Sequence, residues 1–178
     1  MKNKFRTSLM FVAGLAISLQ SFTGFAQEDK SKRPSPPANV SEKVGNTTIT
    51  IDYSQPGVKG RNIWGELVPY GKVWRTGANE ATTFEVSNAV KIEGKTLAAG
   101  KYGLFTIPEK DEWTIIFNSV PDQWGAFDYD ASKDVLRVNV KPKKSPAMTE
   151  RMTFKINKNG TVALLWENLE VDFNVKSQ

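Results

Sequence analysis

The feature that most constrains how this chain can fold is a two-residue alternation of apolar and polar side chains. It is clearest over residues 169–176 (LEVDFNVK), where every odd position is apolar and every even position is polar. Successive side chains of a β-strand point to opposite faces of the sheet, so this pattern predicts strands with one buried face. No segment sustains a 3.6-residue period, and the only helical turn we predict lies around Asn62–Leu67.

Turn residues divide the alternating segments into short strands. Gly45-Asn46 and the segment 157–160 (NKNG) are typical of β-hairpins. The pattern predicts an all-β fold, an antiparallel β-sandwich or jelly-roll-like barrel of about nine or ten strands. We place it in a single domain over residues 40–178, and a short strand over Lys72–Arg75 is among those predicted.

The first 26 residues resemble a secretory signal peptide. Basic residues at positions 2, 4 and 6 precede the apolar run Leu9–Leu19, and the small residues Gly24 and Ala26 suit a signal peptidase. The apolar run is too short to span a bilayer comfortably. We therefore predict an exported protein, periplasmic or secreted after cleavage near Ala26, with no integral membrane span in the mature chain. The charged, Pro-rich residues 27–39 are predicted to form a flexible linker.

Charge and composition exclude several classes of function. Without the three basic residues of the predicted signal peptide, 21 basic residues face 19 acidic ones, a net charge of about +2. This balance is not that of a nucleic-acid binder. The chain has no Cys and no His, which excludes disulfides, Cys nucleophiles, Ser-His-Asp triads and His- or Cys-ligated zinc. We predict no cofactor, and carboxylates, Lys, Tyr and Arg remain for chemistry.

A long irregular stretch interrupts the alternating pattern at residues 53–84. It is rich in Gly, Pro, Trp and Tyr. Such a segment inside a compact domain is usually functional. We therefore predict that a loop over residues 54–84 forms the site, together with a second irregular loop over residues 121–134.

Three blocks of the sequence resemble a known family. They are residues 53–84, with PYGKVWRTGANEAT the most specific part, then LAAGKYGLFTIP with DEWTIIFN, and finally WGAFDYDASKDVLRVNVKP. These blocks are similar to those of a family of exported bacterial proteins, the domain-of-unknown-function family 2911. The resemblance covers nearly all of residues 40–175 and implies an exported single-domain β-protein. The family brings no established activity, so it assigns no catalytic residue.

Ten residues of the two irregular loops carry groups that suit a ligand site. An arginine with amide and carboxylate neighbours offers hydrogen bonds to a carboxylate or to sugar hydroxyls. Flat aromatic rings stack on sugars and on apolar ligands. The predicted ligand-binding residues are Arg61, Trp64, Tyr70, Trp74, Arg75, Asn79, Glu80, Trp124, Asp128 and Tyr129.

Each of these groups also has a purely structural interpretation. Arg75 and Glu80 could form an ion pair that ties the loop to the sheet, and the aromatic rings could pack in the core. Asp128 could instead meet Arg61 or Arg75. The oxygens of residues 128–134 (DYDASKD) alternate as in a calcium loop, but the glycine and the bidentate glutamate of such a loop are missing. We predict no metal site there, and an Asp-capped turn before the next strand.

Three functions are compatible with these residues. We favour a non-catalytic binding module of the cell envelope for a small polar or saccharide ligand. A structural or assembly protein of the envelope is the first alternative, and it predicts an exposed apolar patch without a pocket. A carboxylate-dependent hydrolase of glycosidase type is the second, with Glu80 and Asp128 as its catalytic pair. That chemistry requires two carboxyl groups facing each other at roughly 5 to 9 Å.

Overall fold

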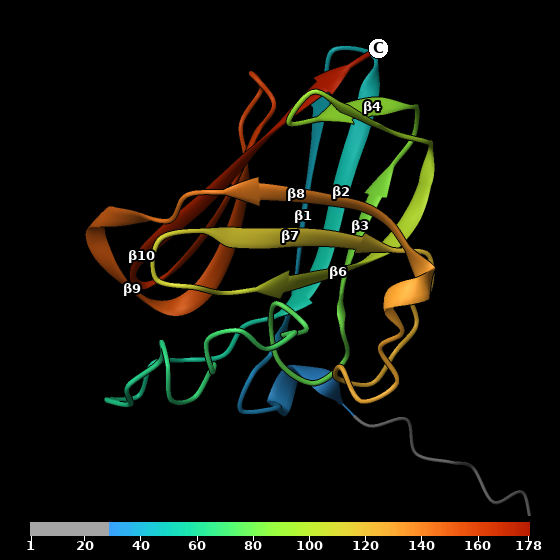
Figure 1. The fold of residues 1–178 in the computed structure, drawn as a ribbon. Coiled ribbons are helices and arrows are strands. Elements are labelled where there is room, and N and C mark those ends of the chain that lie inside the picture. The colour runs from blue at the N-terminus through green and yellow to red at the C-terminus, as the bar shows by residue number, and fades with distance from the viewer. Residues whose placement is uncertain (1–28) are drawn as a thin grey trace, which may run out of the picture.

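Two antiparallel β-sheets packed face to face form the fold (Figure 1). The computed structural model describes residues 29–178, and the predicted signal peptide lies outside them. Six strands form one sheet in the order β1-β2-β3-β6-β7-β8, and four form the other in the order β5-β4-β10-β9. The elements are η1 (Lys30–Lys32), β1 (Pro37–Val44), β2 (Thr47–Ser54), β3 (Thr82–Val86), β4 (Val90–Ile92), β5 (Lys95–Leu97), β6 (Gly100–Ile107), β7 (Trp113–Asn118), η2 (Ala131–Lys133), β8 (Asp134–Val140), β9 (Lys143–Ile156) and β10 (Thr161–Ser177). The sheets do not close into a barrel, so of the two predicted architectures the sandwich is correct.

Both predicted hairpins are confirmed. Val44 pairs with Thr47 across Gly45-Asn46, and Gly45 has the positive φ of +62° that such a tight turn requires. Ile156 pairs with Val162 across the turn at 157–160. The turn residues therefore set the register of the strands that they join.

The alternating segments at 161–166 and 169–176 belong to the single long element β10. Its two ends lie side by side, because Val175 N–H donates to the carbonyl oxygen of Gly160 at 2.8 Å and Thr161 Oγ1 contacts Asn174 Oδ1 at 3.4 Å. The chain must therefore reverse direction inside β10. The positive φ of Glu167, +56°, lies midway between these contacts.

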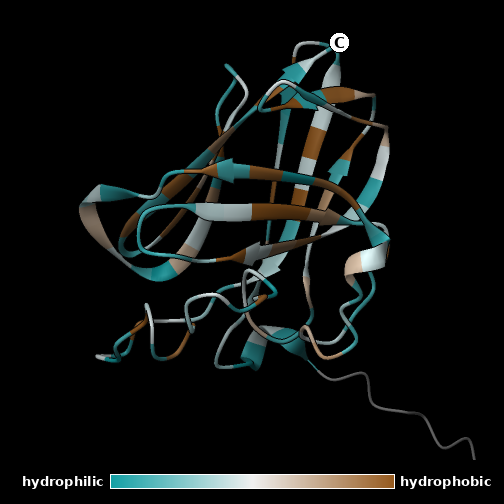
Figure 2. Ribbon diagram, in the orientation of Figure 1, coloured by the Kyte–Doolittle hydropathy of each residue, from teal (hydrophilic) through white to brown (hydrophobic). Residues whose placement is uncertain are grey.

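The main core lies between the two sheets. The apolar side chains of the alternating strands fill it, among them Ile51, Phe84 and Phe117 from one sheet and Phe173 from the other. Figure 2 shows the same alternation, since hydrophobic and hydrophilic bands follow one another along the strands. Burial of these side chains at about 1.5–3 kcal/mol each is the main source of stability in a chain without disulfides.

A second, smaller core lies on the outer face of the six-stranded sheet. Phe105 and Ile116 alternate with Leu104 and Phe117, which face the main core, so both faces of β6 and β7 are buried. The side chains that cover this outer cluster come from the two irregular loops and from β6: Val73, Ile107, Ala126 and Tyr129. This packing holds both loops at one end of the sandwich, the lower end in Figure 1.

The predictions about local structure in the first loop are wrong. Residues 62–67 do not form a helix, because Gly65 takes a φ of +87° and the segment closes as a turn, with Val68 N–H donating to the oxygen of Ile63. The predicted strand at Lys72–Arg75 is reduced to an isolated bridge between Trp74 and Thr106. The helices that residues 29–178 do contain are the short 3₁₀ turns η1 and η2, and none in that range is long and apolar enough to cross a membrane.

Candidate functional site

A groove of about 550 Å³ lies beside the loop at 121–124, over the outer face of the six-stranded sheet. Asp52 of β2 and Thr83 of β3 belong to its lining, and they point away from the main core because they alternate with Ile51 and Phe84. The loop forms one wall of the groove with Pro121, Asp122, Gln123 and Trp124. Lys30, from the N-terminal residues, lines the groove as well.

Strand register gathers polar side chains around Asp52 in this groove. Asn39, Asp52 and Thr83 are direct neighbours on β1, β2 and β3. Asn39 Nδ2 donates to Asp52 Oδ1 at 2.6 Å, and Thr83 Oγ1 donates to Asp52 Oδ2 at 3.5 Å. Lys101 Nζ lies 3.7 Å from the same carboxylate. The groove therefore presents amide, hydroxyl, carboxylate and ammonium groups side by side.

The wall that the loop at 121–124 forms is fixed by backbone contacts. Ala81 N–H donates to the oxygen of Gln123 at 2.9 Å, and Glu80 forms an isolated bridge with Trp124. Trp124 is 56% exposed. Gln123 Nε2 donates to Val120 O at 2.7 Å, which leaves its Oε1 buried without a hydrogen-bond partner among the described residues. An unpaired acceptor of this kind is costly unless a ligand or water satisfies it.

The residues before β1 are anchored to the site. Lys30 Nζ donates to Glu80 Oε1 at 2.8 Å, and Arg33 Nη1 donates to both Glu80 oxygens at 2.9 and 3.0 Å. The Arg33 guanidinium also lies 5.9 Å from the centre of the Trp124 ring. From residue 29 onward, the predicted flexible linker is thus packed against the fold, and β1 begins at Pro37 rather than at Val40. Ion pairs explain why this segment is not a free linker, since Lys30 and Arg33 both pair with Glu80. The ion pair considered between Arg75 and Glu80 is therefore not formed.

These contacts control the ionisation of Glu80. Burial raises the pKa of its carboxyl, but hydrogen bonds from Lys30, from its own backbone and from Arg33 outweigh that effect and lower the pKa from 4.5 to about 2. Glu80 therefore stays ionised at neutral pH. A carboxylate in this state cannot serve as a general acid there.

Replacing Glu80 with glutamine should give a pH-dependent loss of stability. A lowered folded-state pKa contributes stability above the unfolded pKa of about 4.5, and this contribution disappears as the pH falls towards 2. The side chain is 40% exposed, so solvent screening limits the loss at pH 7 to about 1 kcal/mol. Urea unfolding of Glu80→Gln and the unchanged protein from pH 2 to 7 measures the difference. A stability difference between the two proteins that is the same at every pH would contradict the lowered pKa of Glu80.

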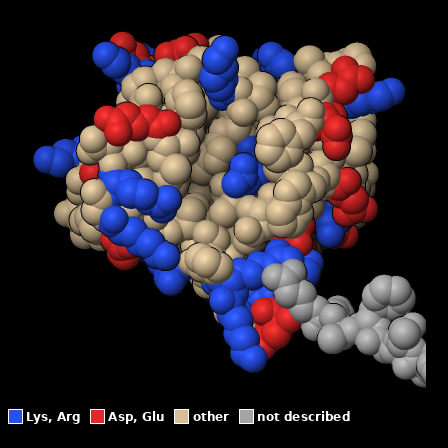
Figure 3. Space-filling model, turned by 90° about the horizontal axis from the view of Figure 1, so that it is seen from below, with Lys and Arg blue, Asp and Glu red and all other residues tan. Residues whose placement is uncertain are grey.

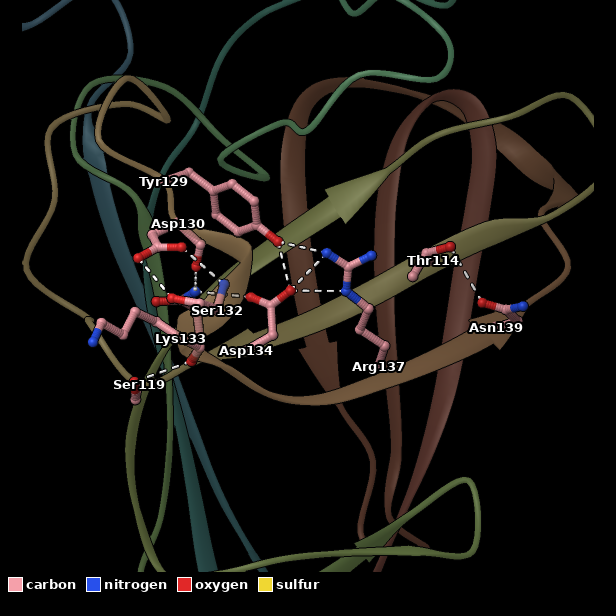
Figure 4. A network of polar contacts seen from close by, with 10 residues as sticks. Thr114, Ser119, Tyr129, Asp130, Ser132, Lys133, Asp134, Arg137 and Asn139 are labelled. Carbon is pink, nitrogen blue, oxygen red and sulfur yellow. Dashed lines mark hydrogen bonds and ion pairs between the residues drawn. The ribbon is translucent and has the colours of Figure 1, made fainter.

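Tyr129 belongs to a separate polar network that anchors the second loop (Figure 4). Its hydroxyl donates to Asp134 Oδ2 at 2.6 Å, and Arg137 Nε donates to the same oxygen at 2.8 Å. Asn118 Nδ2 donates to the other oxygen at 2.8 Å. Burial, together with the hydrogen bond and charge of Asp134, raises the pKa of Tyr129 to about 12, so its phenol stays neutral. The predicted Asp-capped turn is present, because Asp130 accepts from Ser132 N–H at the start of η2.

Of the predicted aromatic residues, Trp74 lies in the core and the half-buried Trp64 packs against it. Trp64 and Trp74 form a cluster with Trp113 and Trp166, and ring centres within it lie 5.1 to 6.3 Å apart. Most of these pairs are edge-to-face, the geometry that aromatic quadrupoles favour. Tyr70 is half-buried and packs against Gly65. Among the predicted aromatic residues, Trp124 is the one that lines the groove.

The remaining predicted residues lie in different places. Arg61 is exposed and its Nε donates to the oxygen of Val58 at 3.1 Å. Asn79 holds the chain before β1, with Nδ2 donating to the oxygen of Ser35 at 2.9 Å. Asp128 is exposed and does not line the groove, whereas Glu80 does. The structure thus does not bring Glu80 and Asp128 into one cavity, as a hydrolase with this pair would require.

Of the ten predicted residues, Glu80 and Trp124 line the groove. Sequence reasoning missed Asn39, Asp52 and Thr83, although the outward position of Asp52 in an alternating strand was readable. Figure 3 views the loop end of the molecule, where charged side chains surround a depression formed largely by uncharged atoms. Among residues 29–178 no cluster of three or more acidic side chains is placed to hold a metal ion.

The fold and the groove define an antiparallel β-sandwich protein with an open, mixed polar and aromatic site. A family model matches residues 35–175, that of DUF2911, described as a protein of unknown function. The match covers most of the chain, so the protein belongs to this family, and the resemblance seen in the sequence is confirmed. No curated protein and no solved structure matches the chain.

Proposed function

We propose that this protein is a non-catalytic binding module whose groove takes a small polar ligand, with saccharides the best-supported class. The predicted export to the periplasm or the cell exterior is part of the proposal, because saccharides and other small polar molecules occur in the cell envelope. The proposal differs in one respect from what the sequence suggested. The ligand would contact the outer face of β1–β3 in addition to the loop at 121–124.

The observation that carries the proposal is the pairing of an exposed indole with polar side chains in one groove. Trp124 offers a flat apolar face at 56% exposure, and the polar side chains of Gln123 and Asp52 line the same groove. Sugar rings combine an apolar C–H face with hydroxyl groups that both donate and accept hydrogen bonds. Stacking on Trp124 would leave such hydroxyls beside Gln123 and Asp52.

The volume of the groove supports a ligand of limited size. Small-molecule sites usually enclose about 300 to 1,000 Å³ and combine apolar surface with a few placed polar groups. The groove, at about 550 Å³, lies in this range. A mono- to trisaccharide is therefore the size class that we expect.

Binding should depend on Trp124, which gives the first test of the groove. We expect a panel of neutral, amino and uronic-acid oligosaccharides to include at least one that shifts the Trp124 indole N–H signal saturably in ¹H–¹⁵N NMR spectra. Trp124→Ala should weaken that binding about tenfold or more, since it removes the stacking surface. Trp64, Trp74, Trp113 and Trp166 form the core cluster, so their indole signals should move little.

Phe127→Ala is the matched control for this experiment. Phe127 is in the same loop and is 83% exposed, but it does not line the groove. Phe127→Ala should therefore leave the affinity for the saccharide within about twofold of that of the unchanged protein. If no saccharide in the panel moves the Trp124 signal, or if both substitutions weaken binding equally, the groove is not a saccharide site.

One observation favours the assembly alternative. Val120, Trp124 and Phe127 are exposed apolar side chains of a single loop, and such groups mark contact surfaces when they gather. Self-association in analytical ultracentrifugation that Phe127→Ala abolishes would support an assembly role for this loop. Binding of a saccharide by a monomer that Phe127→Ala does not alter would favour the binding module.

A further inference from the structure

Arg75 differs from the other arginines of the described chain. Arg33, Arg61, Arg137 and Arg151 each donate to a carboxylate or to a backbone carbonyl oxygen. Arg75 has no ion pair and no side-chain hydrogen bond among residues 29–178, and its Nε is buried without a partner. A half-buried charge without a counter-ion destabilises a fold, so this arrangement requires an explanation.

The backbone determines where this guanidinium points. Trp74 and Thr106 exchange two backbone hydrogen bonds of 2.8 and 2.9 Å, which places residues 73–75 alongside β6. Trp74 faces the main core, so Val73 and Arg75 project to the opposite side. Val73 packs there against the outer cluster of Phe105 and its neighbours. The Arg75 side chain therefore starts from an apolar surface, where electrostatic interactions are stronger than in water.

Only part of the guanidinium is covered. Nε is closed off, whereas Nη1 and Nη2 are not among the buried polar atoms without a partner, so they reach solvent. Burial lowers the pKa of Arg75, and no neighbouring carboxylate raises it. Arginine remains protonated in proteins nonetheless. The terminal nitrogens thus present a charged donor pair to the outside, and no described protein group occupies it.

We propose that Arg75 anchors a second binding site, separate from the groove, for the oxyanion group of a small molecule. Arg75 does not line the groove, so the two sites are distinct. A guanidinium binds carboxylate and phosphate groups through two parallel hydrogen bonds, which compact cations such as lysine cannot reproduce. An oxyanion would also supply the missing counter-charge. The group of the ligand that binds Arg75 is therefore a carboxylate or a phosphate.

Direct observation of the arginine Nε–H signals tests the site. The protein is titrated with sodium acetate and, separately, with sodium phosphate, against sodium chloride at equal ionic strength. We expect the Arg75 signal to shift saturably at concentrations on the order of 10 mM or lower. The Arg33 and Arg137 signals should not shift, because carboxylates already occupy these side chains. The anion that saturates at the lower concentration distinguishes carboxylate from phosphate as the ligand group.

Two variants distinguish specific binding at Arg75 from general attraction of anions to positive charge. Arg75→Lys keeps the charge but loses the paired donors, so apparent affinity should fall about tenfold. Lys72→Gln removes an exposed positive charge three residues away and should change affinity less than about twofold. A response that is linear up to the highest concentration, or that Lys72→Gln reduces as much as Arg75→Lys does, overturns the proposal.

The stability of Arg75→Gln shows whether Arg75 serves only to hold the fold together. Because Arg75 has no protein partner, Arg75→Gln should be as stable as the unchanged protein or more so. Phosphate or acetate should then raise the melting temperature of the unchanged protein but not that of Arg75→Gln. Strong destabilisation by Arg75→Gln in the absence of anions would contradict the site. Trp124→Ala should leave the anion titration intact, so failure of the groove and failure of this site are distinguishable.

Discussion

Replacing Trp113 with alanine is expected to lower the free energy of unfolding by about 3 to 5 kcal/mol. Trp113 is completely buried at the start of β7. Its ring lies 5.1 Å from that of Trp64 and 6.3 Å from that of Trp74, both at steep angles. Alanine would leave a cavity that neighbouring indoles are too rigid to fill, and the aromatic contacts would be lost with the buried area.

Trp124→Ala is the matched control, since it makes the same chemical change at an exposed position. It should cost less than about 0.5 kcal/mol, because an exposed side chain leaves no cavity. Guanidinium unfolding of the two variants beside the unchanged protein gives both values. A loss at Trp113 as small as that at Trp124 would show that the tryptophan cluster does not support the fold. Trp113→Phe, which keeps an aromatic ring, should fall between the two.

The tryptophan cluster also shows why the site could be predicted only in part. Trp113 and Trp166 lie in alternating strands, where the pattern assigns each side chain to a face, and both are buried in the core. Trp64 and Trp74 lie in the irregular loop, where no periodicity indicates which way a side chain faces. Their neighbours, Trp113 and Trp166, are far away in the sequence. Only the folded topology brings the four rings together, so ligand binding and core packing could not be told apart beforehand.

Local pattern was enough for most of the fold. Alternation and turn chemistry predicted the all-β fold and the hairpins at Gly45 and at 157–160 correctly, although the strand predicted at Lys72–Arg75 is an isolated bridge. The order of strands in the sheets carries no such local signal. The pairing of β3 with β6, and of β4 with β10, joins segments whose relation depends on packing. The choice between barrel and sandwich depends on the same long-range pairing.

The groove was missed for a related reason. Asn39, Asp52 and Thr83 look like ordinary solvent-facing positions of separate strands. They become neighbours only through the register of β1, β2 and β3. Charge alone did not reveal that Lys30 and Arg33 fold back onto Glu80, because composition predicts solvation and not a specific partner.

Gly160→Ala is expected to destabilise the protein by more than about 3 kcal/mol. Gly160 closes the β9–β10 turn with a φ of +91°, and its carbonyl oxygen accepts the N–H of Val175 at 2.8 Å. A methyl group at this position would overlap the backbone oxygen of Val175. Backbone atoms cannot move aside as a flexible side chain can. The turn would therefore separate from the far end of β10, with loss of the hydrogen bond that joins them.

Gly94→Ala is the control that separates backbone strain from the steric part of that effect. Gly94 lies in the turn between β4 and β5 with a φ of +84°, close to the value at Gly160, but an added methyl group would meet no atom within 4 Å. Alanine there should cost only the backbone strain of a positive φ, about 1 to 2 kcal/mol. Urea unfolding of both variants gives the difference, which measures how firmly the two ends of β10 are held together. Equal losses at the two glycines would mean that the chain at Val175 yields readily, and that the return of β10 onto its own turn contributes little to stability.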